Sequence, residues 1–450
     1  MKITLIQPAM GRESEQNGES WKMEPLSMTA LAGLTPPEHE VVFYDDRVEA
    51  LPYDEPTDLV AIRTETYTAR RSYQIATEYR KRGVKAVIGG YHATLMPEET
   101  AGFCDAIVLG EAEEVWHEVV ADAAGAGAGA GAGLRARYQA HGRPNLDGLT
   151  PDRSILEGKR YMPLGLVESG RGGKSERDLC SVPAFYAKSH VYRPPADVAA
   201  EIAATGRKLI FLVDDNVVAD FDHAKALCRE LAPLNVYWIS QGTLNVAKDP
   251  ELLRELQRSG CIGLLMGFES VNRFAGFGGA LDKIRDHGIK VYATFVFGHD
   301  HDTPQLFEDT LEFAMEQKFF VAAFNHLQPI PGTPLYARLE QEGRLLYDRW
   351  WLEPGVRFGN VIFRPKNMEP DELSERLMDL RRQFYSYSSI LKRAAEFSAN
   401  VANPASGLFY FLINAILRKE IDEEWGLPLG DLSMPDPVRQ IVHPPIKAVR

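Results

Sequence analysis

Two series of short apolar segments that alternate with helical segments restrict the folds open to this chain of 450 residues. In the first series, helices are expected at 26–34, 68–82 and 112–122, and strands at 2–7, 40–44, 59–62, 86–88 and 106–109. Short apolar strands that alternate with helices form a parallel sheet of the doubly wound type. Residues 1–122 are therefore expected to form an α/β domain.

The second series has the same character and contains six strand–helix units. Strands are expected near 164–168, 208–213, 236–239, 262–266, 290–296 and 320–325. Helices are expected near 196–205, 222–231, 250–259, 280–287 and 304–317. Six such units are the content of a partial α/β barrel, a fold that carries its chemistry on the loops after the strands.

An alternating Ala-Gly repeat at 123–133 separates the two series. Because this repeat has no side chains to bury, it is typical of a flexible linker. We expect a first domain at 1–122, a linker at 123–160 and a barrel at 161–336. The remaining residues, 337–450, are expected to form a helical C-terminal extension, in which 347–351 and 372–385 pack on the mouth of the barrel.

The charge and hydropathy of the chain exclude several classes of partner. A net charge of −13 without a basic stripe argues against a nucleic-acid partner. The apolar run at 407–417 is about half of a membrane span, which favours a buried or surface-lying helix. The first residues indicate a strand rather than a signal peptide. We expect a cytoplasmic protein with a small-molecule substrate and no integral membrane span, and the oligomeric state stays open.

The four cysteines, Cys104, Cys180, Cys228 and Cys261, are widely spaced and form no Cys-x2-Cys pair. This spacing excludes a zinc ribbon and provides no disulfide framework, as expected in a reducing compartment. All except Cys180 lie in apolar surroundings and are expected to be small core residues.

Two strand ends in the first series carry glycines, at 89–94 and 110–113. Doubly wound sheets bind ligands beyond the carboxyl ends of their strands. Glycines at such ends let the backbone approach a large flat or phosphate-bearing ligand, although they also form simple turns.

These segments, together with 21–26 and 58–60, resemble the cobalamin-binding domain of class B radical S-adenosylmethionine (SAM) proteins, a family that includes hopanoid methylases and the anaerobic chlorophyll-ring cyclase. The resemblance implies a Rossmann-like fold and a corrin ring held against three loops. The cofactor contacts that it implies are Thr64, Gly89, Gly90, Tyr91, His92, Thr94, Gly110 and Glu111.

The resemblance also bears on the axial ligand of the cobalt. No histidine of the chain has an aspartate two positions before it, so the Asp-x-His motif of other cobalamin proteins is absent. We therefore expect base-off cobalamin without a histidine ligand from the protein. His92 either contacts the corrin or is a satisfied turn histidine.

The second series is similar to the radical SAM barrel in the order of its strand-end motifs. These motifs lie at 214–216, 240–241, 267–270, 297–300 and 328–335. The resemblance implies that Ser240, Gly267 and Glu269 contact SAM, if SAM binds.

The loop at 168–180 resembles the cluster-binding loop of radical SAM enzymes, which carries Cys-x3-Cys-x2-Cys. Gly173, Arg177 and Cys180 stand at the three cysteine positions. A [4Fe–4S] cluster that cleaves SAM needs three thiolates from this loop. Glycine has no ligand atom and arginine stays cationic. No [4Fe–4S] cluster is therefore expected, and radical chemistry is not expected either.

Several polar residues at predicted strand ends are candidates for chemistry. Glu168, Asp214 and His326 are the predicted acid–base groups, because they face one predicted pocket. Arg171, Arg177 and Tyr186 are the predicted substrate-binding residues, the arginines as partners of an anionic group in place of the cluster. The alternative for the charged loop is ordinary solvation.

These features together predict a cobalamin-dependent enzyme of non-radical chemistry. Methyl transfer with SAM and cobalamin, or a cobalamin-assisted cyclisation or rearrangement in secondary metabolism, is the leading hypothesis. The alternatives are a non-catalytic cobalamin carrier, sensor or partner protein, and a true radical SAM enzyme with an atypically ligated cluster.

Overall fold

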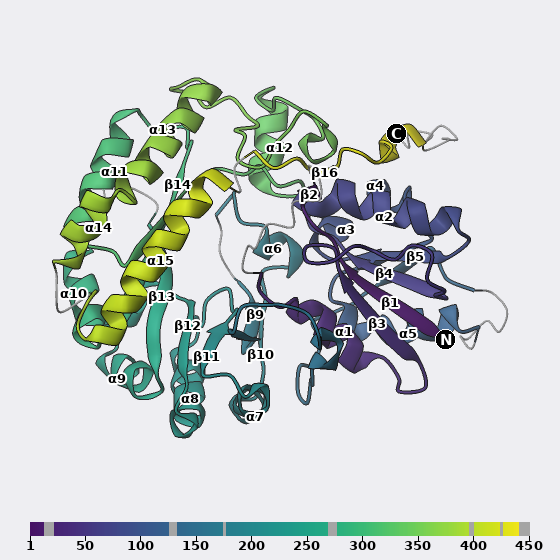
Figure 1. The fold of residues 1–450 in the computed structure, drawn as a ribbon, viewed down its shortest axis with the longest axis horizontal. Coiled ribbons are helices and arrows are strands. Elements are labelled where there is room, and N and C mark those ends of the chain that lie inside the picture. The colour runs from purple at the N-terminus through teal and green to yellow at the C-terminus, as the bar shows by residue number, and fades with distance from the viewer. Residues whose placement is uncertain are drawn as a thin grey trace.

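The computed structural model describes residues 1–12, 22–125, 133–173, 177–268, 277–395, 400–423 and 426–440. The described chain contains two six-stranded parallel sheets that lie side by side, each covered by helices (Figure 1). This arrangement confirms the α/β fold class, with a doubly wound first part and a barrel-like second part.

The first sheet has the strand order β3-β1-β4-β5-β6-β7, and every neighbouring pair is parallel. Its strands are β1 (Lys2–Gln7), β3 (Glu40–Asp45), β4 (Leu59–Arg63), β5 (Lys85–Gly89), β6 (Ala106–Leu109) and β7 (Arg137–Gln139). The helices of this half are α1 (Leu26–Leu34), α2 (Ala69–Lys81), α3 (Tyr91–Leu95), α4 (Pro97–Ala101) and α5 (Trp116–Ala123). Because β7 lies within 123–160, the sheet extends into the range expected as a linker.

Two apolar cores cover the two faces of the first sheet, because neighbouring strand residues point to opposite faces. One core contains Met28 of α1 and Trp116 of α5. The other contains Tyr73 of α2 together with Trp350 and Trp351 of the 3-10 helix η7 (Trp350–Leu352). The segment 347–351 therefore packs on the first sheet, and it also contacts the loop after the last barrel strand, where Trp350 donates to the Pro329 carbonyl at 3.0 Å.

The second sheet has the order β15-β14-β13-β12-β11-β8, again parallel throughout. Its strands are β8 (Gly165–Val167), β11 (Leu209–Leu212), β12 (Tyr237–Gln241), β13 (Cys261–Phe268), β14 (Lys290–Phe297) and β15 (Val321–His326). The intervening helices are α7 (Pro195–Thr205), α8 (Phe221–Leu231), α9 (Pro250–Arg258), α10 (Gly278–Asp286) and α11 (Gln305–Glu316). Strands in strict chain order are the topology of a partial barrel.

The C-terminal region joins both halves. Helices α12 (Pro334–Gln341), α13 (Pro370–Phe384), α14 (Tyr387–Ala394) and α15 (Pro404–Glu423) follow the last barrel strand, and α13 packs against β15. The chain then returns to the first half, where β16 (Gly430–Asp431) pairs with β2 (Gly11–Arg12), followed by α16 (Pro437–Gln440). None of the described helices is long and apolar enough to cross a bilayer.

A small antiparallel unit occupies the space between the two sheets. It consists of β9 (Gly170–Gly172) paired with β10 (His190–Tyr192), and of the short helix α6 (Val182–Phe185) (Figure 1). The unit grows out of the loop after β8, so that loop is placed opposite the carboxyl edge of the first sheet.

Candidate cofactor and active site

A cavity of about 400 Å³ opens where the carboxyl ends of the first sheet face β8 and β9. The first sheet contributes Ala61, Val87 and Val108, and helix α1 contributes Met28 and Leu31. The opposite wall is formed by Leu166, Glu168, Arg171, Phe185, Tyr186 and Arg193. The carboxyl edge of a doubly wound sheet is the usual ligand-binding edge.

Glycine turns form the floor of this cavity. Gly90 has a φ of +109°, and a Cβ there would lie 2.7 Å from the carbonyl oxygen of Thr64. Gly110 has a φ of +78°. Both backbone conformations are ones that side-chain-bearing residues rarely adopt. The predicted contacts Gly89, Gly90 and Gly110 therefore line the cavity with bare backbone.

Thr94 and Thr64 support this floor from behind. The Thr94 hydroxyl donates to the Gly90 carbonyl (3.0 Å) and accepts from the Gly110 amide (2.9 Å). Thr64 is fully buried, and its amide donates to the Gly89 carbonyl (2.8 Å). Neither threonine lines the cavity, so both are placed to position the glycine turns.

Aromatic side chains close the side of the cavity nearest α6. Tyr91 stacks on Phe185 with the ring centroids 4.2 Å apart, and Tyr186 meets Tyr91 edge-on at 6.0 Å. The Arg143 guanidinium lies 4.5 Å from the centre of the Tyr186 ring. Burial raises the pKa of both tyrosines, so both stay neutral. Tyr186 is therefore part of an aromatic wall.

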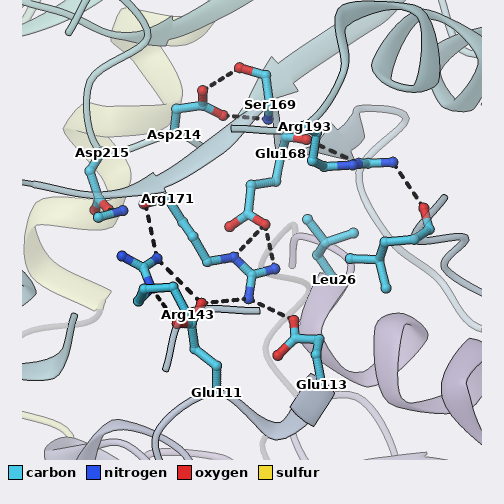
Figure 2. A network of polar contacts seen from close by, with 12 residues as sticks. Leu26, Glu111, Glu113, Arg143, Glu168, Ser169, Arg171, Arg193, Asp214 and Asp215 are labelled. Atoms are coloured by element: carbon cyan, nitrogen blue, oxygen red, sulfur yellow. Dashed lines mark hydrogen bonds and ion pairs between the residues drawn. The ribbon is translucent and has the colours of Figure 1, made fainter. Parts of the chain in front are cut away.

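A network of buried charges joins the two halves beside this wall (Figure 2). Arg171 donates through Nε to Glu168 Oε2 (2.8 Å) and through Nη1 to Glu113 Oε1 (2.6 Å). Its Nη1 also contacts Glu111 Oε1 at 3.4 Å, and Arg143 binds Glu111 Oε2 at 2.5 Å. Arg171 is thus surrounded by three carboxylates of the protein, which argues against its predicted role as a binder of a substrate anion.

Glu168 is the carboxylate of this network that lies in the barrel-side wall of the cavity. Burial raises its pKa, and the attraction of Arg171 offsets this effect only in part. A raised carboxyl pKa brings proton exchange closer to neutrality, which suits a general acid or base.

The other predicted acid, Asp214, holds the loop between β8 and β9 rather than lining the cavity. Its carboxylate accepts hydrogen bonds from the Ser169 amide (2.7 Å) and the Ser169 hydroxyl. Burial raises its pKa to about 7. The neighbouring Asp215 accepts from the Gly172 amide at 2.9 Å. This pair of aspartates fixes the backbone that presents Glu168 and Arg171 (Figure 2).

Both predicted histidines are buried away from the cavity. His92 lies within hydrogen-bond distance of Thr66 Oγ1 (3.3 Å) and Glu99 Oε1 (3.1 Å). His326 has its ring nitrogens near the carbonyls of Leu327 (3.0 Å) and Gly359 (3.2 Å), and burial lowers its pKa to about 4. The structure therefore favours the satisfied-histidine alternative for His92 and a packing role for His326.

The loop at 168–180, where its residues are described, contacts the mouth of the barrel. A Cβ on Gly267 would lie 3.9 Å from Arg177 Nη1, so the Arg177 guanidinium stands beside the end of β13. Asp178 pairs with Arg338 of α12 at 3.1 Å. Cys180 is half-buried nearby, whereas Gly173 precedes residues 174–176, which lie outside the described residues.

Two of the three predicted SAM contacts, Ser240 and Gly267, lie within the described residues. Glu269 lies outside the described residues. Ser240 is fully buried and donates to the Leu212 carbonyl at 2.7 Å, which places it inside the sheet. Gly267 stands next to the Arg177 guanidinium, as described above.

Comparison with known proteins gives relatives for most of the chain. The model of the B12 binding domain matches residues 22–120, and a domain of unknown function, DUF4070, matches residues 333–411. The bacteriochlorophyllide d C-12(1)-methyltransferase of Chlorobaculum tepidum is 27% identical, over 93% of this chain and 94% of its own length. The hopanoid C-2 methylase of Rhodopseudomonas palustris is 22% identical, over 82% of this chain and 73% of its own.

A third relative is the anaerobic magnesium-protoporphyrin IX monomethyl ester cyclase of Cereibacter sphaeroides, which is 26% identical over 72% of this chain and 59% of its own length. These relatives are of the kind that the class B radical SAM family contains. The resemblance stated from the sequence motifs is thereby confirmed.

A solved structure shares the fold of this chain. The radical SAM methyltransferase TsrM from Kitasatospora setae, solved with cobalamin and a [4Fe–4S] cluster bound, superposes with a TM-score of 0.60. The match covers 85% of this chain and 81% of that chain at 17% identity. At that identity the match shows the common fold.

Three residues of the site escaped the sequence analysis. Arg143 lies in the range expected as a linker, and Glu113 and Ser169 were read as parts of motifs without a role of their own. Their contacts join segments up to 58 residues apart in the chain. No local pattern signals such pairings.

Proposed function

We propose that this chain is a cobalamin-dependent enzyme that transfers a methyl group from SAM to a small molecule by polar chemistry, without a [4Fe–4S] cluster. The observation that carries the proposal is the cavity whose glycine floor belongs to the segment that matches the B12 binding domain. Two methylating relatives support methyl transfer. The cyclase relative supports a cobalamin-assisted cyclisation or rearrangement as the variant of the same proposal.

The residues that line the cavity fit cobalamin. A large flat ligand needs a floor without side chains, which Gly89, Gly90 and Gly110 supply. Met28 and Leu31 add an apolar wall along α1. These five residues would hold the group.

The same cavity supports the expectation that the protein provides no histidine to the cobalt. No histidine is among the described residues that line it. His92, which follows the glycine turn directly, is committed to Glu99 and Thr66 in the core.

Cobalamin, when bound, supplies a cobalt centre that can accept a methyl group and pass it to a nucleophile. The protein then has to orient the substrate and remove its proton. Glu168 is placed for the proton transfer, because it lies in the cavity wall with a raised pKa. The stacked rings of Tyr91 and Phe185 exclude water beside it.

The positions of the cysteines support chemistry without the usual cluster. Cys180 is the only thiol at the three motif positions. Cys104 packs in the first half, whereas Cys228 of α8 and Cys261 at the start of β13 pack in the second. Burial raises the pKa of Cys104 to about 12 and that of Cys228 to about 11, which disfavours the thiolate form that binds iron.

Product analysis tests the type of chemistry. The protein is incubated anaerobically with reduced cobalamin and isotope-labelled SAM, and the nucleoside products are separated. Polar methyl transfer breaks the bond between sulfur and the methyl group, and it releases S-adenosylhomocysteine. Reductive cleavage releases 5′-deoxyadenosine instead. We expect S-adenosylhomocysteine alone; 5′-deoxyadenosine would overturn the polar mechanism, and a lack of both would favour the non-catalytic alternative.

A cavity-filling substitution tests the position of the cofactor. Leu31→Trp places a larger side chain at the apolar wall, and we expect cobalamin affinity to fall about tenfold or more. Leu311→Trp on α11 is the matched control, because Leu311 is also a half-buried helical leucine but lies outside the cavity. Equal affinities of the two variants, measured by cobalamin absorption, would contradict the proposed location.

A further inference from the structure

Helix α15 has two apolar stripes, one on each side of the helix. On the inner side, Tyr410 is fully buried, and its hydroxyl donates to the Ile390 carbonyl of α14 at 2.8 Å. Ile413 and Leu417 continue this side and pack on the core of the second sheet. On the outer side, Leu408 is 72% exposed. A helix with apolar residues on both sides normally has neighbours on both sides, whereas the described part of the chain covers α15 on its inner side only.

The outer stripe has the spacing of a contact between helices. Its exposed positions are alternately three and four residues apart, at Ala405, Leu408, Leu412 and Ala415. This alternation keeps side chains on one face of a helix, and it is the pattern of positions that pack against a second helix. The two leucines stand at the middle of the stripe and one alanine stands at either end. The stretch 404–417 contains no charged residue.

Helix α14 adds to the exposed apolar area. Its Leu391 is 62% exposed and its Tyr387 is 69% exposed. Tyr387 lies beside the end of α15, because the Arg418 guanidinium is 4.4 Å from the centre of its ring. Single exposed apolar residues are ordinary, but a group of them marks an interaction site. Of the eleven large apolar side chains exposed in the described chain, six form what we name the α14–α15 surface: Tyr387, Leu391, Leu408, Phe409, Phe411 and Leu412.

The two ends of α15 differ in charge. The last turns of the helix have three acidic and two basic residues, Arg418, Lys419, Glu420, Asp422 and Glu423. The helix dipole adds negative partial charge at this end and positive partial charge at the N-terminal end. Helix α14 runs back along α15 from Arg418, since its Arg393 donates to Asn414 Oδ1 at 3.0 Å. The exposed Lys392 of α14 therefore lies toward the N-terminal end of α15.

We propose that the α14–α15 surface joins two copies of this chain, with the two α15 helices antiparallel about a twofold axis. A twofold interface uses the same patch on both copies, so that patch has to be complementary to itself. The outer stripe meets this condition, because it reads Ala-Leu-Leu-Ala from either end. Antiparallel pairing brings Leu408 against Leu412 of the second copy, and Ala405 against Ala415 of the second copy.

Charge selects this occupant and this direction. Antiparallel pairing places the acidic end of each α15 beside the N-terminal end of the other helix, where the dipole is positive and Lys392 is exposed. Parallel pairing would place the two acidic ends side by side. An anionic membrane would repel the acidic end of α15 and a chain of net charge −13. The uncharged stretch is thus the part of this acidic chain that a second copy approaches without repulsion.

The dimer is independent of the proposed enzyme activity. Helices α14 and α15 lie on the side of the molecule away from the first sheet, whose carboxyl edge carries the cavity (Figure 1). Both cavities of a dimer built on this surface would stay open to ligands. A failure of the dimer would therefore leave the proposed function untouched.

Light scattering after size-exclusion chromatography tests the proposal. The purified full chain is measured from about 10 to 100 μM, and we expect the mass of two chains. The double variant Leu408→Glu/Leu412→Glu places carboxylates in the middle of the stripe. It is expected to raise the dissociation constant of the dimer about a hundredfold or more. Tyr237→Glu is the matched control, because Tyr237 is 61% exposed on β12, outside the α14–α15 surface. It is expected to stay dimeric.

Disulfide formation tests the antiparallel direction. In the proposed dimer, the double variant Ala405→Cys/Ala415→Cys brings thiols of the two copies together, whereas the two positions of one helix are about 15 Å apart. Mild oxidation should therefore yield a covalent dimer on a non-reducing gel. Ala405→Cys alone should not, because its two copies would lie at opposite ends of the contact. Wild-type protein, with its four cysteines, provides the baseline.

Three results would overturn the proposal. The first is a wild-type monomer at about 100 μM. The second is equal dimerisation of the double Glu variant and Tyr237→Glu. Circular dichroism verifies that both are folded, and Leu412→Gln replaces the double variant if it is not. The third is a covalent dimer from Ala405→Cys alone in the same yield as from the double Cys variant. A monomer that sediments with phosphatidylglycerol vesicles would assign the surface to lipid instead.

Discussion

The role of His92 follows from its hydrogen-bond partner, the carboxylate of Glu99. Oε1 of Glu99 lies within hydrogen-bond distance of His92 (3.1 Å), Tyr73 (2.9 Å) and Trp351 (2.8 Å). The last partner is 252 residues away in the chain. Because buried polar groups need partners, this arrangement ties η7 of the C-terminal region to the first sheet. A histidine beside a glycine turn thus serves the core.

His92→Ala is therefore expected to lower stability without lowering cofactor affinity. Removal of one partner of Glu99 should reduce the free energy of unfolding by about 1–3 kcal/mol. Urea unfolding measures this loss, and a cobalamin titration of the folded variant measures affinity. A variant with wild-type stability and a tenfold weaker affinity would instead show that His92 contacts the corrin.

A second prediction concerns the effect of the Asp214 carboxyl group on the pH dependence of stability. Burial raises its folded-state pKa to about 7 from the ordinary value of 3.8. The folded protein therefore holds this proton more tightly than the unfolded chain, and the contribution to stability is present below pH 3.8 and is lost as the pH rises toward 7. The change is on the order of 4 kcal/mol.

Asp214→Asn removes this titration while it keeps a hydrogen-bonding side chain of the same shape. Between pH 4 and 7, the stability of the wild type should fall relative to that of the variant. Urea unfolding at several pH values measures the difference. Parallel pH profiles for the two proteins would contradict a raised pKa at Asp214.

Local sequence patterns predicted strands more completely than they predicted the roles of polar residues. The expected strands at 2–7 and 106–109 coincide with β1 and β6, because apolar runs bounded by turns determine them. Strand β7 was missed because it has three residues, Arg-Tyr-Gln, and follows the Ala-Gly repeat. The sequence left two roles open for His92, and the burial of His326 follows from the packing of the whole molecule, which no local pattern shows.

Arg171 joins elements of the two halves through ion pairs with three carboxylates. It lies on β9, and its carboxylate partners include Glu111 and Glu113, at the 3-10 helix η2 (Ala112–Glu114) of the first half. The third partner, Glu168, follows β8. Without the arginine, the three buried carboxylates would repel one another.

Arg171→Met is expected to lower the free energy of unfolding by about 3–5 kcal/mol at neutral pH. The loss should shrink as the pH falls, because Glu111 and Glu168 already have raised pKa values and gain protons first. The matched control is Arg135→Met, since Arg135 also pairs with two carboxylates but is 53% exposed. That control is expected to cost much less, because water screens an exposed ion pair. Equal losses for both variants would contradict the account of Arg171.

The complete chain places its cavity between two α/β units that the sequence predicted separately. The sequence motifs did not predict how the two units are arranged relative to each other. That arrangement depends on Arg143, from the range expected as a linker, and on the unit of β9, β10 and α6. The return of β16 to β2 closes the same arrangement from the C-terminal side. The glycine turns at the edge of the first sheet and the residues that follow β8 thus face each other across one cavity.

Metal analysis tests the proposed cofactor content directly. The protein is expressed with hydroxocobalamin and purified anaerobically. Cobalt, iron and sulfide are measured per chain, together with the visible spectrum. We predict stoichiometric cobalt with the spectrum of base-off cobalamin, and iron far below stoichiometric. About four irons and four sulfides per chain would be a [4Fe–4S] cluster held in spite of the missing cysteines, and it would contradict the proposed polar chemistry.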